Sequence, residues 1–296
     1  MIASRLETVE IGRITFRVRH WGDDDAPTIV MLHGWLDSAV TFQFVVDALQ
    51  EEWHVVAPDL RGHGGSHRTY ESYFFLQMVA DLDAILERYS PDQPVRLVGH
   101  SWGANVSSVF AGVRPQRVSH LVNLEGLAPI PGFRQGTPAE MLDKWLTTLR
   151  AGPQNRCYAN HEELAARLRK ANPRLPADRA RFFAQEFSQA RAEGCLEFDV
   201  DPYQHAGTPW FGHQDVVDSV WPKIDAPVLL VTGSESFAIK AFDDQPGLLQ
   251  QRLALVRNLK HVNLLGAGHN VHHDMPERIA ELIEHFLIHT DRENFR

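Results

Sequence analysis

The residues around Ser101 have the types and spacing that nucleophilic catalysis requires. An apolar run at residues 95–98 leads into Gly99-His100-Ser101-Trp102-Gly103, which has the G-x-S-x-G pattern of a nucleophile elbow. A serine hydroxyl is a weak nucleophile, so it must face a base and a substrate at once. A sharp strand-to-helix turn exposes the hydroxyl, and flanking glycines keep side chains out of the turn. The stretch predicts Ser101 as a nucleophile.

A nucleophilic serine needs a base, and His269 is the candidate. His269 stands in a glycine-containing loop directly after the last apolar run, at residues 260–265. His272 and His273 follow three and four residues later and are alternative bases. A histidine cluster also suggests a metal, but one His-x-x-His-His stretch in a loop is weak evidence for a metal site.

The base in turn needs an acid to orient it, and Glu125 is the candidate. Glu125 directly follows the apolar run at residues 118–124. Burying a carboxylate is costly unless it is paired, and the imidazolium of His269 would be a suitable partner. The order Ser101, Glu125, His269 also agrees with the Ser, Asp/Glu, His order of one enzyme fold. A salt bridge to an arginine is the alternative role for Glu125.

Strands and helices must alternate along the chain to position these residues. Residues 8–12 and 14–21 predict an antiparallel hairpin. Further strands are expected at residues 28–32, 53–58, 95–98, 118–124, 227–232 and 260–265, and helices at 73–89, 104–113 and 276–290. Such alternation predicts an α/β fold with a mainly parallel central sheet. Ser101, Glu125 and His269 would then lie at the carboxyl ends of strands, where α/β folds place their sites.

Four stretches together resemble landmarks of the α/β-hydrolase superfamily, in that family's order. They are His33-Gly34-Trp35, the loop at residues 59–66, Gly99-His100-Ser101-Trp102-Gly103 and Gly268-His269-Asn270. The resemblance covers nearly the whole chain and implies a serine hydrolase of the esterase type with a helical cap. It also implies an oxyanion hole formed by the backbone N–H groups of Trp35 and Trp102. An aromatic pocket wall is the alternative role for Trp35.

The same resemblance leaves more than one position for the acid that orients His269. Many members of the superfamily carry an aspartate at the position of Ser236, which cannot hold a charge beside an imidazolium. Glu235 is one residue away, so its side chain would point elsewhere, and Asp243 and Asp244 lie further along. Other members place the acid where Glu125 stands, so Glu125 is the prediction.

Between residues 128 and 212 the alternation of strand and helix breaks. Helical stretches are expected there at residues 138–150, 161–170 and 176–193. We therefore predict a core domain at residues 1–127 and 213–296, with a helical cap inserted at residues 128–212.

Composition and charge indicate which binding partners and which cellular location to expect for this protein. The 296 residues carry a formal charge of −9, which argues against nucleic acid. No apolar run approaches the roughly 18 residues of a membrane span, and the first ten residues do not resemble a signal peptide. Cys157 and Cys195 are therefore expected to be reduced, in a cytoplasmic protein. A metal site at Asp59, His63 and His67 lacks regular ligand spacing, and neither metal nor cofactor is expected.

The predicted reaction is hydrolysis of a carboxylic ester, or of a thioester, through an acyl-enzyme on Ser101. A carbon–carbon bond hydrolase or a haloperoxidase-like enzyme could use the same triad, and a ligand-binding module without catalysis is the alternative from another class. The substrate's charge is also open. Residues 145–191 hold nine basic and four acidic side chains. This excess would steer an anionic or carrier-bound substrate, or be an ordinary solvated surface.

Overall fold

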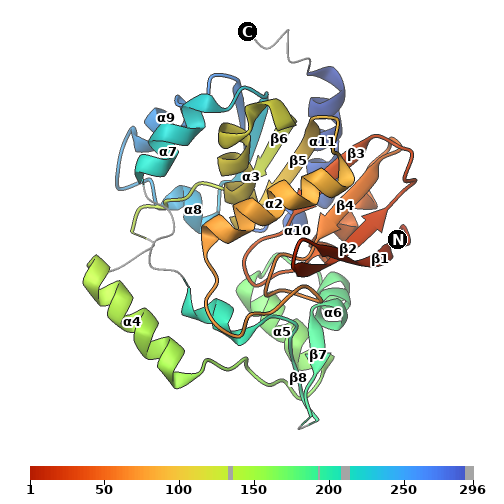
Figure 1. Cartoon of the computed structure of the whole chain (residues 1–296), viewed down its shortest axis with the longest axis vertical. Coiled ribbons are helices and arrows are strands. Elements are labelled where there is room, and N and C mark those ends of the chain that lie inside the picture. Colours follow the sequence, from red (N-terminus) through yellow and green to blue (C-terminus); the bar gives the residue numbers. More distant parts are fainter. Residues whose placement is uncertain (133–135, 193, 208–213, 291–296) are drawn as a thin grey trace.

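A β-sheet forms the centre of the molecule, as Figure 1 shows, and it has eight strands. This computed structural model describes residues 1–132, 136–192, 194–207 and 214–290. The strands lie in the order β1-β2-β4-β3-β5-β6-β9-β10. Their bounds are β1 Arg5–Ile11, β2 Ile14–Trp21, β3 Thr28–Leu32, β4 His54–Pro58, β5 Val95–His100, β6 Val118–Leu124, β9 Val228–Gly233 and β10 Leu259–Leu264. β2 is antiparallel to β1 and β4, and all pairs from β4 to β10 are parallel. The predicted α/β fold class is confirmed.

Helices cover both faces of the sheet because its central strands are apolar on both sides. One face packs against α2 (Phe75–Tyr89), α3 (Trp102–Val113) and α7 (Gln214–Val220). The other face packs against α1 (Gln43–Val46), α10 (Val271–Asp274) and α11 (Pro276–His289). Within the described ranges, no helix combines the length and the apolar character needed to cross a bilayer.

The parallel strands deliver the candidate site residues to one edge of the sheet. Ser101 follows β5, Glu125 follows β6, and the loop that carries His269 follows β10. Because these strands run in the same direction, their carboxyl ends meet at the same edge. Short helices α8 (Phe237–Lys240) and α9 (Leu248–Leu253) follow β9 before the chain enters β10.

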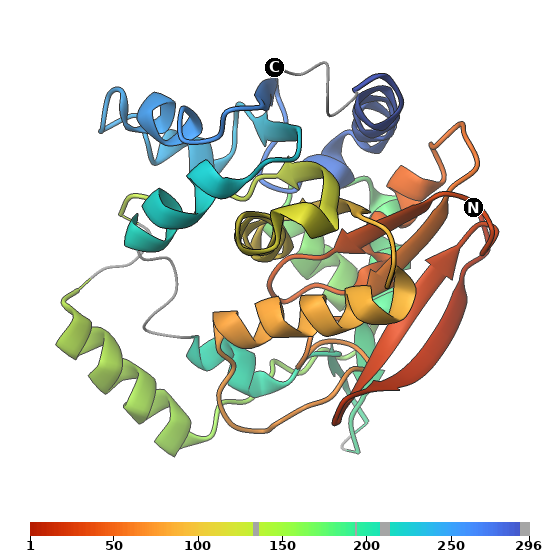
Figure 2. The ribbon, with the colours of Figure 1, turned by 45° about the horizontal axis from the view of Figure 1, so that its top comes forward.

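The segment between β6 and α7 leaves and rejoins the sheet as an insertion. It contains α4 (Pro138–Ala151), α5 (His161–Ala171), α6 (Ala177–Glu186), β7 (Ser188–Ala190) and β8 (Leu196–Phe198). α5 and α6 pack on each other through a small core that includes Leu164, Ala180 and Phe183. Both Figure 1 and Figure 2 show α4 at the periphery, away from the sheet. The predicted end of this segment at residue 212 lies outside the described residues.

Two of the three helices predicted in the insertion are confirmed, and the third was predicted too long. α6 ends at Glu186 instead of continuing to residue 193, which itself is not among the described residues. The chain then forms the antiparallel pair β7–β8. Phe187 buries its ring against Phe183 at the end of α6, and its carbonyl accepts a hydrogen bond from the Asp199 amide. The pairing of Phe187 with Asp199 and of β7 with β8 outweighs the local helical propensity of the residues that follow Glu186.

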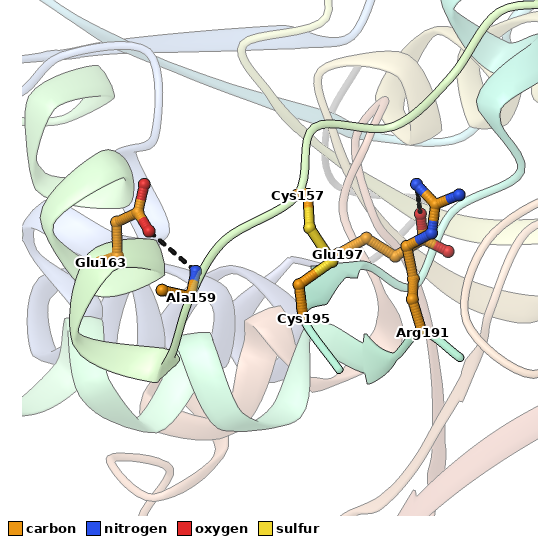
Figure 3. The surroundings of a disulfide bond; sticks show 6 residues. All are labelled: Cys157, Ala159, Glu163, Arg191, Cys195 and Glu197. Carbon is orange, nitrogen blue, oxygen red and sulfur yellow. Dashed lines mark hydrogen bonds and ion pairs between the residues drawn. A yellow bond between two sulfur atoms is a disulfide. The ribbon is translucent and has the colours of Figure 1, made fainter. Parts of the chain in front are cut away.

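The expectation that both cysteines are reduced is wrong for this structure. Cys157 and Cys195 form a disulfide, as Figure 3 shows. Their Cα atoms lie 5.8 Å apart. The backbones of Tyr158 and Leu196 pair through two hydrogen bonds of 2.8 Å, and this pairing holds the two sulfur atoms side by side. The bond ties β8 to the start of α5. The cytoplasmic location stays a prediction.

Candidate active site

Ser101 lies at a strained turn between β5 and α3. Its backbone has φ 49° and ψ −106°, a left-handed φ that a residue with a side chain rarely adopts. The close approach of the flanking segments explains the neighbouring glycines. A Cβ on Gly99 would lie 2.5 Å from the Cα of Ala104, and a Cβ on Gly103 would lie 2.3 Å from the carbonyl oxygen of Leu32. Strain of this kind is typical of functional sites.

Among the three histidines considered as bases, His269 is the one hydrogen-bonded to Ser101. Its Nε2 lies 2.8 Å from Ser101 Oγ, and its side chain is 19% exposed. His272 and His273 are buried instead, and their Nε2 atoms lie 2.8 and 2.7 Å from Thr41 Oγ1. The structure thus brings His269 to the serine and directs the other two away.

Glu125 completes a continuous chain of hydrogen bonds from Ser101. Its Oε2 lies 3.0 Å from His269 Nδ1, and its side chain is fully buried. The Gly233 amide donates to Oε1 at 2.6 Å and the Ser236 hydroxyl donates to Oε2. These donors offset the cost of burying a carboxylate. Glu125 also has a positive φ of 65°. Ser101 and Glu125, which directly follow β5 and β6, therefore both have uncommon backbone conformations.

The other candidate acids lie elsewhere. Glu235 is exposed, and its Oε2 accepts from Lys240 Nζ at 2.7 Å. The nearby cation lowers the pKa of the Glu235 carboxyl. Asp243 and Asp244 are exposed. No arginine takes the place of His269 as the partner of Glu125 among the ion pairs of the described residues.

The hydrogen-bond pattern defines which nitrogen of His269 can act as a base. An ionised carboxylate only accepts hydrogen bonds, so Nδ1 facing Glu125 must carry a proton. In the neutral ring, Nε2 then presents a lone pair to the hydroxyl of Ser101. The geometry therefore permits transfer of the Ser101 proton to His269 while Glu125 stabilises the imidazolium that results.

Trp35 and Trp102 lie on two backbone segments close to Ser101. Trp102 is the first residue of α3, so its amide belongs to the helix N-terminus, where backbone N–H groups point outward. Trp35 lies in the turn after β3, next to Gly34. A Cβ on Gly34 would lie 3.6 Å from the Cβ of Ser101, so this backbone passes close to the serine. The indole of Trp35 is partly exposed and contacts the ring of His205 edge-on.

The loop considered for metal binding makes structural contacts. Asp59 accepts from Arg17 Nε at 2.6 Å and from the Ala39 amide at 2.8 Å. His63 Nε2 accepts from the Leu36 amide at 3.1 Å, and Nδ1 faces the Arg61 carbonyl oxygen at the same distance. Both side chains support the backbone around the site.

Sequence reasoning did not assign roles to Gly233 and Ser236. Ser236 was noted only because an aspartate is common at its position, yet its hydroxyl holds the displaced acid Glu125 in place. The sequence did contain a signal for this contact. Glu125 follows one predicted strand, and Ser236, a short hydrogen-bond donor, stands after another strand at the position where many relatives have the acid.

A sequence model of the alpha/beta hydrolase fold matches residues 27–276 of this chain. The chain belongs to the α/β-hydrolase family. The match confirms the resemblance noted in the sequence. This α/β hydrolase is 27% identical over 282 residues to a "Serine hydrolase-like protein" of Danio rerio, covering 90% of this chain and 83% of that protein.

Two further relatives of this α/β hydrolase have named activities. The 2-(acetamidomethylene)succinate hydrolase of Mesorhizobium japonicum is 27% identical over 279 residues, which cover 94% of each chain. The solved structure of the thioesterase domain from the curacin biosynthetic pathway is 30% identical, with a TM-score of 0.84, and covers 95% of this chain and 99% of that domain. The first of these relatives is named as a hydrolase and the second as a thioesterase.

Proposed function

We propose that this α/β hydrolase cleaves a carboxylic ester or a thioester by way of an acyl-enzyme on Ser101. The observation that carries the proposal is the continuous hydrogen-bond chain from Ser101 Oγ through both nitrogens of His269 to Glu125. Such a chain activates a serine hydroxyl, which is unreactive alone. The strained backbone of Ser101 supports the same role.

In the first half of the proposed reaction, Ser101 Oγ forms a bond to the carbonyl carbon while His269 Nε2 takes the hydroxyl proton. The negative charge that develops on the carbonyl oxygen is stabilised by the N–H groups of Trp35 and Trp102. His269 then gives its proton to the leaving alcohol or thiol, which departs with the bonding electrons. Water attacks the acyl-enzyme in the second half with His269 as the base, and the acid is released.

The choice of bond rests on the nucleophile and on the relatives. A serine is the nucleophile expected for acyl transfer, and similarity to a thioesterase domain supports including thioesters. The relative that acts on 2-(acetamidomethylene)succinate supports hydrolysis as the reaction class. A ligand-binding module would not need a strained serine that is hydrogen-bonded to an imidazole, with that imidazole in turn hydrogen-bonded to a carboxylate.

We further propose that residues 128–212 form a cap over this site and that residues 1–127 and 213–296 form the core domain. Contacts between the insertion and the loop of His269 support this division. Asn172 Nδ2 donates to Asp274 Oδ1 at 2.7 Å, and Asp274 Oδ2 accepts from the Gly268 amide at 2.7 Å. Arg174 Nε donates to the Gly266 carbonyl at 2.7 Å. The turn between α5 and α6 thus holds the segment that precedes His269.

We propose that the substrate is a small ester or acyl compound that carries negative charge, either on itself or on a carrier. Arg174 is exposed, and its Nη1 would lie 2.9 Å from a Cβ on Gly268, beside His269. The other basic side chains of residues 145–191 include three paired with glutamates: Arg156, Arg179 and Arg191. Arg174 therefore is the basic side chain whose position best suits an anion at the site.

A series of p-nitrophenyl esters of graded acyl length, with matched thioesters, tests the proposed reaction. We expect turnover of at least one member and a loss of up to about 10⁶-fold in kcat for Ser101→Ala, with an unchanged circular dichroism spectrum. Equal turnover by wild type and Ser101→Ala would exclude Ser101 as the nucleophile. Bound acyl product in a single-turnover experiment would separate the acyl-enzyme route from direct attack by water.

A further inference from the structure

A second group of polar side chains lies directly behind the candidate active site. Asp37 follows the turn of Trp35, His100 precedes Ser101, and His272 belongs to α10. Each can offer one ligand atom, and these atoms lie within 4.8 Å of one another. His100 is 3% exposed and His272 is fully buried, while Asp37 is only half-buried. The group thus combines two buried imidazole rings with one carboxylate.

The ring of His100 is held in the form that binds metals. Its Nε2 lies 3.0 Å from the backbone carbonyl oxygen of His269. Because a carbonyl oxygen only accepts hydrogen bonds, Nε2 carries the proton and Nδ1 holds the lone pair. Nδ1 is buried and has no hydrogen-bond partner within the described part of the chain. Histidines that bind metals typically donate their other ring N–H to such an oxygen.

The ring of His272 can take the same arrangement. Thr41 Oγ1 lies 2.8 Å from His272 Nε2 and 2.7 Å from His273 Nε2. In the metal-binding form, the Thr41 hydroxyl donates its single proton to His273 and accepts from His272 Nε2–H. This leaves a lone pair on His272 Nδ1, which is also buried and unpartnered among the described residues. A cation that accepts both lone pairs would satisfy these two buried nitrogens at once.

Electrostatics at the cluster favour a cation. Burial lowers the pKa of both His100 and His272 well below the ordinary value, so both rings are neutral ligands at neutral pH. Burial raises the pKa of the Asp37 carboxyl to about 7, and the charge of Asp59 adds to this shift. A divalent ion would satisfy the carboxylate and both imidazoles at once.

We propose that Asp37, His100 and His272 bind one divalent transition-metal ion, for which Zn²⁺ is the probe, and that the bound ion inhibits hydrolysis. Two imidazoles and one carboxylate, with water as a further ligand, form a common zinc donor set. Ligand atoms in a tetrahedral zinc site lie roughly 3.3 Å apart. The side chains must therefore move together by about an ångström from their present spacing.

Inhibition follows from the position of the ion, and this part rests on the proposed function. The rings of His100 and His269 have centroids 5.3 Å apart, and His100 holds the backbone of His269. Drawing the three ligands together around an ion would shift the His100 ring, and with it the His269 backbone that His100 holds, away from the geometry that places His269 Nε2 2.8 Å from Ser101 Oγ. The ion should therefore lower kcat without occupying the position of the substrate.

A second cluster, His20, Asp24 and His54, also meets the distance criterion for a metal and provides a matched control. The nitrogens that face one another there already have hydrogen-bond partners, since His20 Nδ1 lies 3.0 Å from His54 Nε2, which lies 3.1 Å from Asp24 Oδ1. Asp24 is exposed there and pairs with Arg5. His54→Gln therefore removes a ligand of equal chemistry from a place where no binding is expected.

Binding is tested without reference to activity. Metal-free protein is titrated with ZnCl₂ by calorimetry, and imidazole ¹H–¹⁵N spectra of the wild type are recorded at each step. We expect one equivalent to bind, with the Nδ1 signals of two histidines moving. Asp37→Asn and His272→Gln should each weaken binding at least about tenfold, whereas His54→Gln should leave it unchanged. Absence of saturable binding, or its loss in His54→Gln alone, would overturn the site.

Inhibition is tested separately with the preferred ester. Zn²⁺ should lower kcat of the wild type with little change in KM, and a chelator should restore the rate. Zinc that binds as expected but leaves kcat unchanged would overturn the coupling to His269. If no ester is turned over at all, the proposed function fails while the calorimetric result still decides the metal site.

Discussion

His269 Nδ1 lies 3.0 Å from Glu125 Oε2, which joins two residues 144 positions apart in the chain. The proposed acid thus comes from the end of β6, and Ser236, which follows β9 at the position where many relatives have the acid, donates to the same carboxylate. Two neighbouring strands share one task, since one supplies the charge and the other fixes its orientation.

Replacing Glu125 by Gln should lower kcat by about 10⁴-fold, because an amide at this position no longer enforces the tautomer that places a lone pair on Nε2. Glu235→Gln is the matched control, since Glu235 is exposed and pairs with Lys240. We expect near-normal kcat for that variant. Steady-state kinetics on the preferred ester checks both, and a larger loss in Glu235→Gln than in Glu125→Gln would contradict the assignment of the acid.

The Cys157–Cys195 bond should stabilise the insertion. It closes a loop of 38 residues, and the loss of chain entropy predicts a contribution of about 4 kcal/mol. Denatured protein prepared without reductant should contain no free thiol by colorimetric titration. Cys157→Ser should lower Tm relative to the oxidised wild type and match the wild type measured in reductant. Two titratable thiols in protein purified without reductant would show that the bond does not form.

The fold should lose stability as the pH falls below about 6.5. Burial lowers the pKa of His33 to about 4 and of His63 and His273 to about 3. Between those values and 6.5 the unfolded chain binds more protons, so each histidine costs about 1.4 kcal/mol per pH unit as pH falls. Asp37, with its pKa raised to about 7, acts in the opposite direction because the folded state binds its proton first.

The histidines outnumber Asp37, so the net effect of acid is destabilising. Urea unfolding at pH 7, 6 and 5 measures this slope. His63→Gln should make the slope shallower by about the contribution of one group, because a glutamine does not titrate. A free energy of unfolding that stays constant or rises between pH 7 and 5 would contradict the buried neutral state of these rings.

An anionic ester should be preferred over a neutral ester of equal chain length at low salt. The charge of Arg174 acts through solvent, so this preference should shrink when the Debye length falls from about 10 Å at 0.1 M to about 3 Å at 1 M salt. Arg174→Gln should reduce kcat/KM for the anionic ester more than for the neutral one. Equal kcat/KM for both esters at both salt concentrations would contradict this attraction and show that the basic side chains of the insertion form an ordinary solvated surface.

The elements that carry the site could be predicted because their signals are local. Apolar runs and glycine-flanked turns placed β3, β5, β6 and β10 to within a few residues, and the position of Glu125 after β6 followed from one such run. Because parallel strands end at a common edge, the meeting of Ser101, Glu125 and His269 was a consequence of fold class.

Features that depend on distant pairing could not be predicted. The disulfide forms because the backbones of Tyr158 and Leu196 pair across 38 residues, which no local pattern encodes. The end of α6 at Glu186 depends on the burial of Phe187. The grouping of Asp37, His100 and His272 likewise joins a loop, the end of β5 and α10, so no single stretch of sequence indicated it.

The central claim is that Ser101 is a nucleophile activated through His269 by Glu125. A fluorophosphonate probe tests it directly, because only an activated serine forms the phosphonyl adduct. Intact mass spectrometry should show one adduct on the wild type, peptide mapping should place it on Ser101, and Ser101→Ala should remain unlabelled. Glu125→Gln should label far more slowly. An unlabelled wild-type protein, or an adduct on any other residue, would contradict the account.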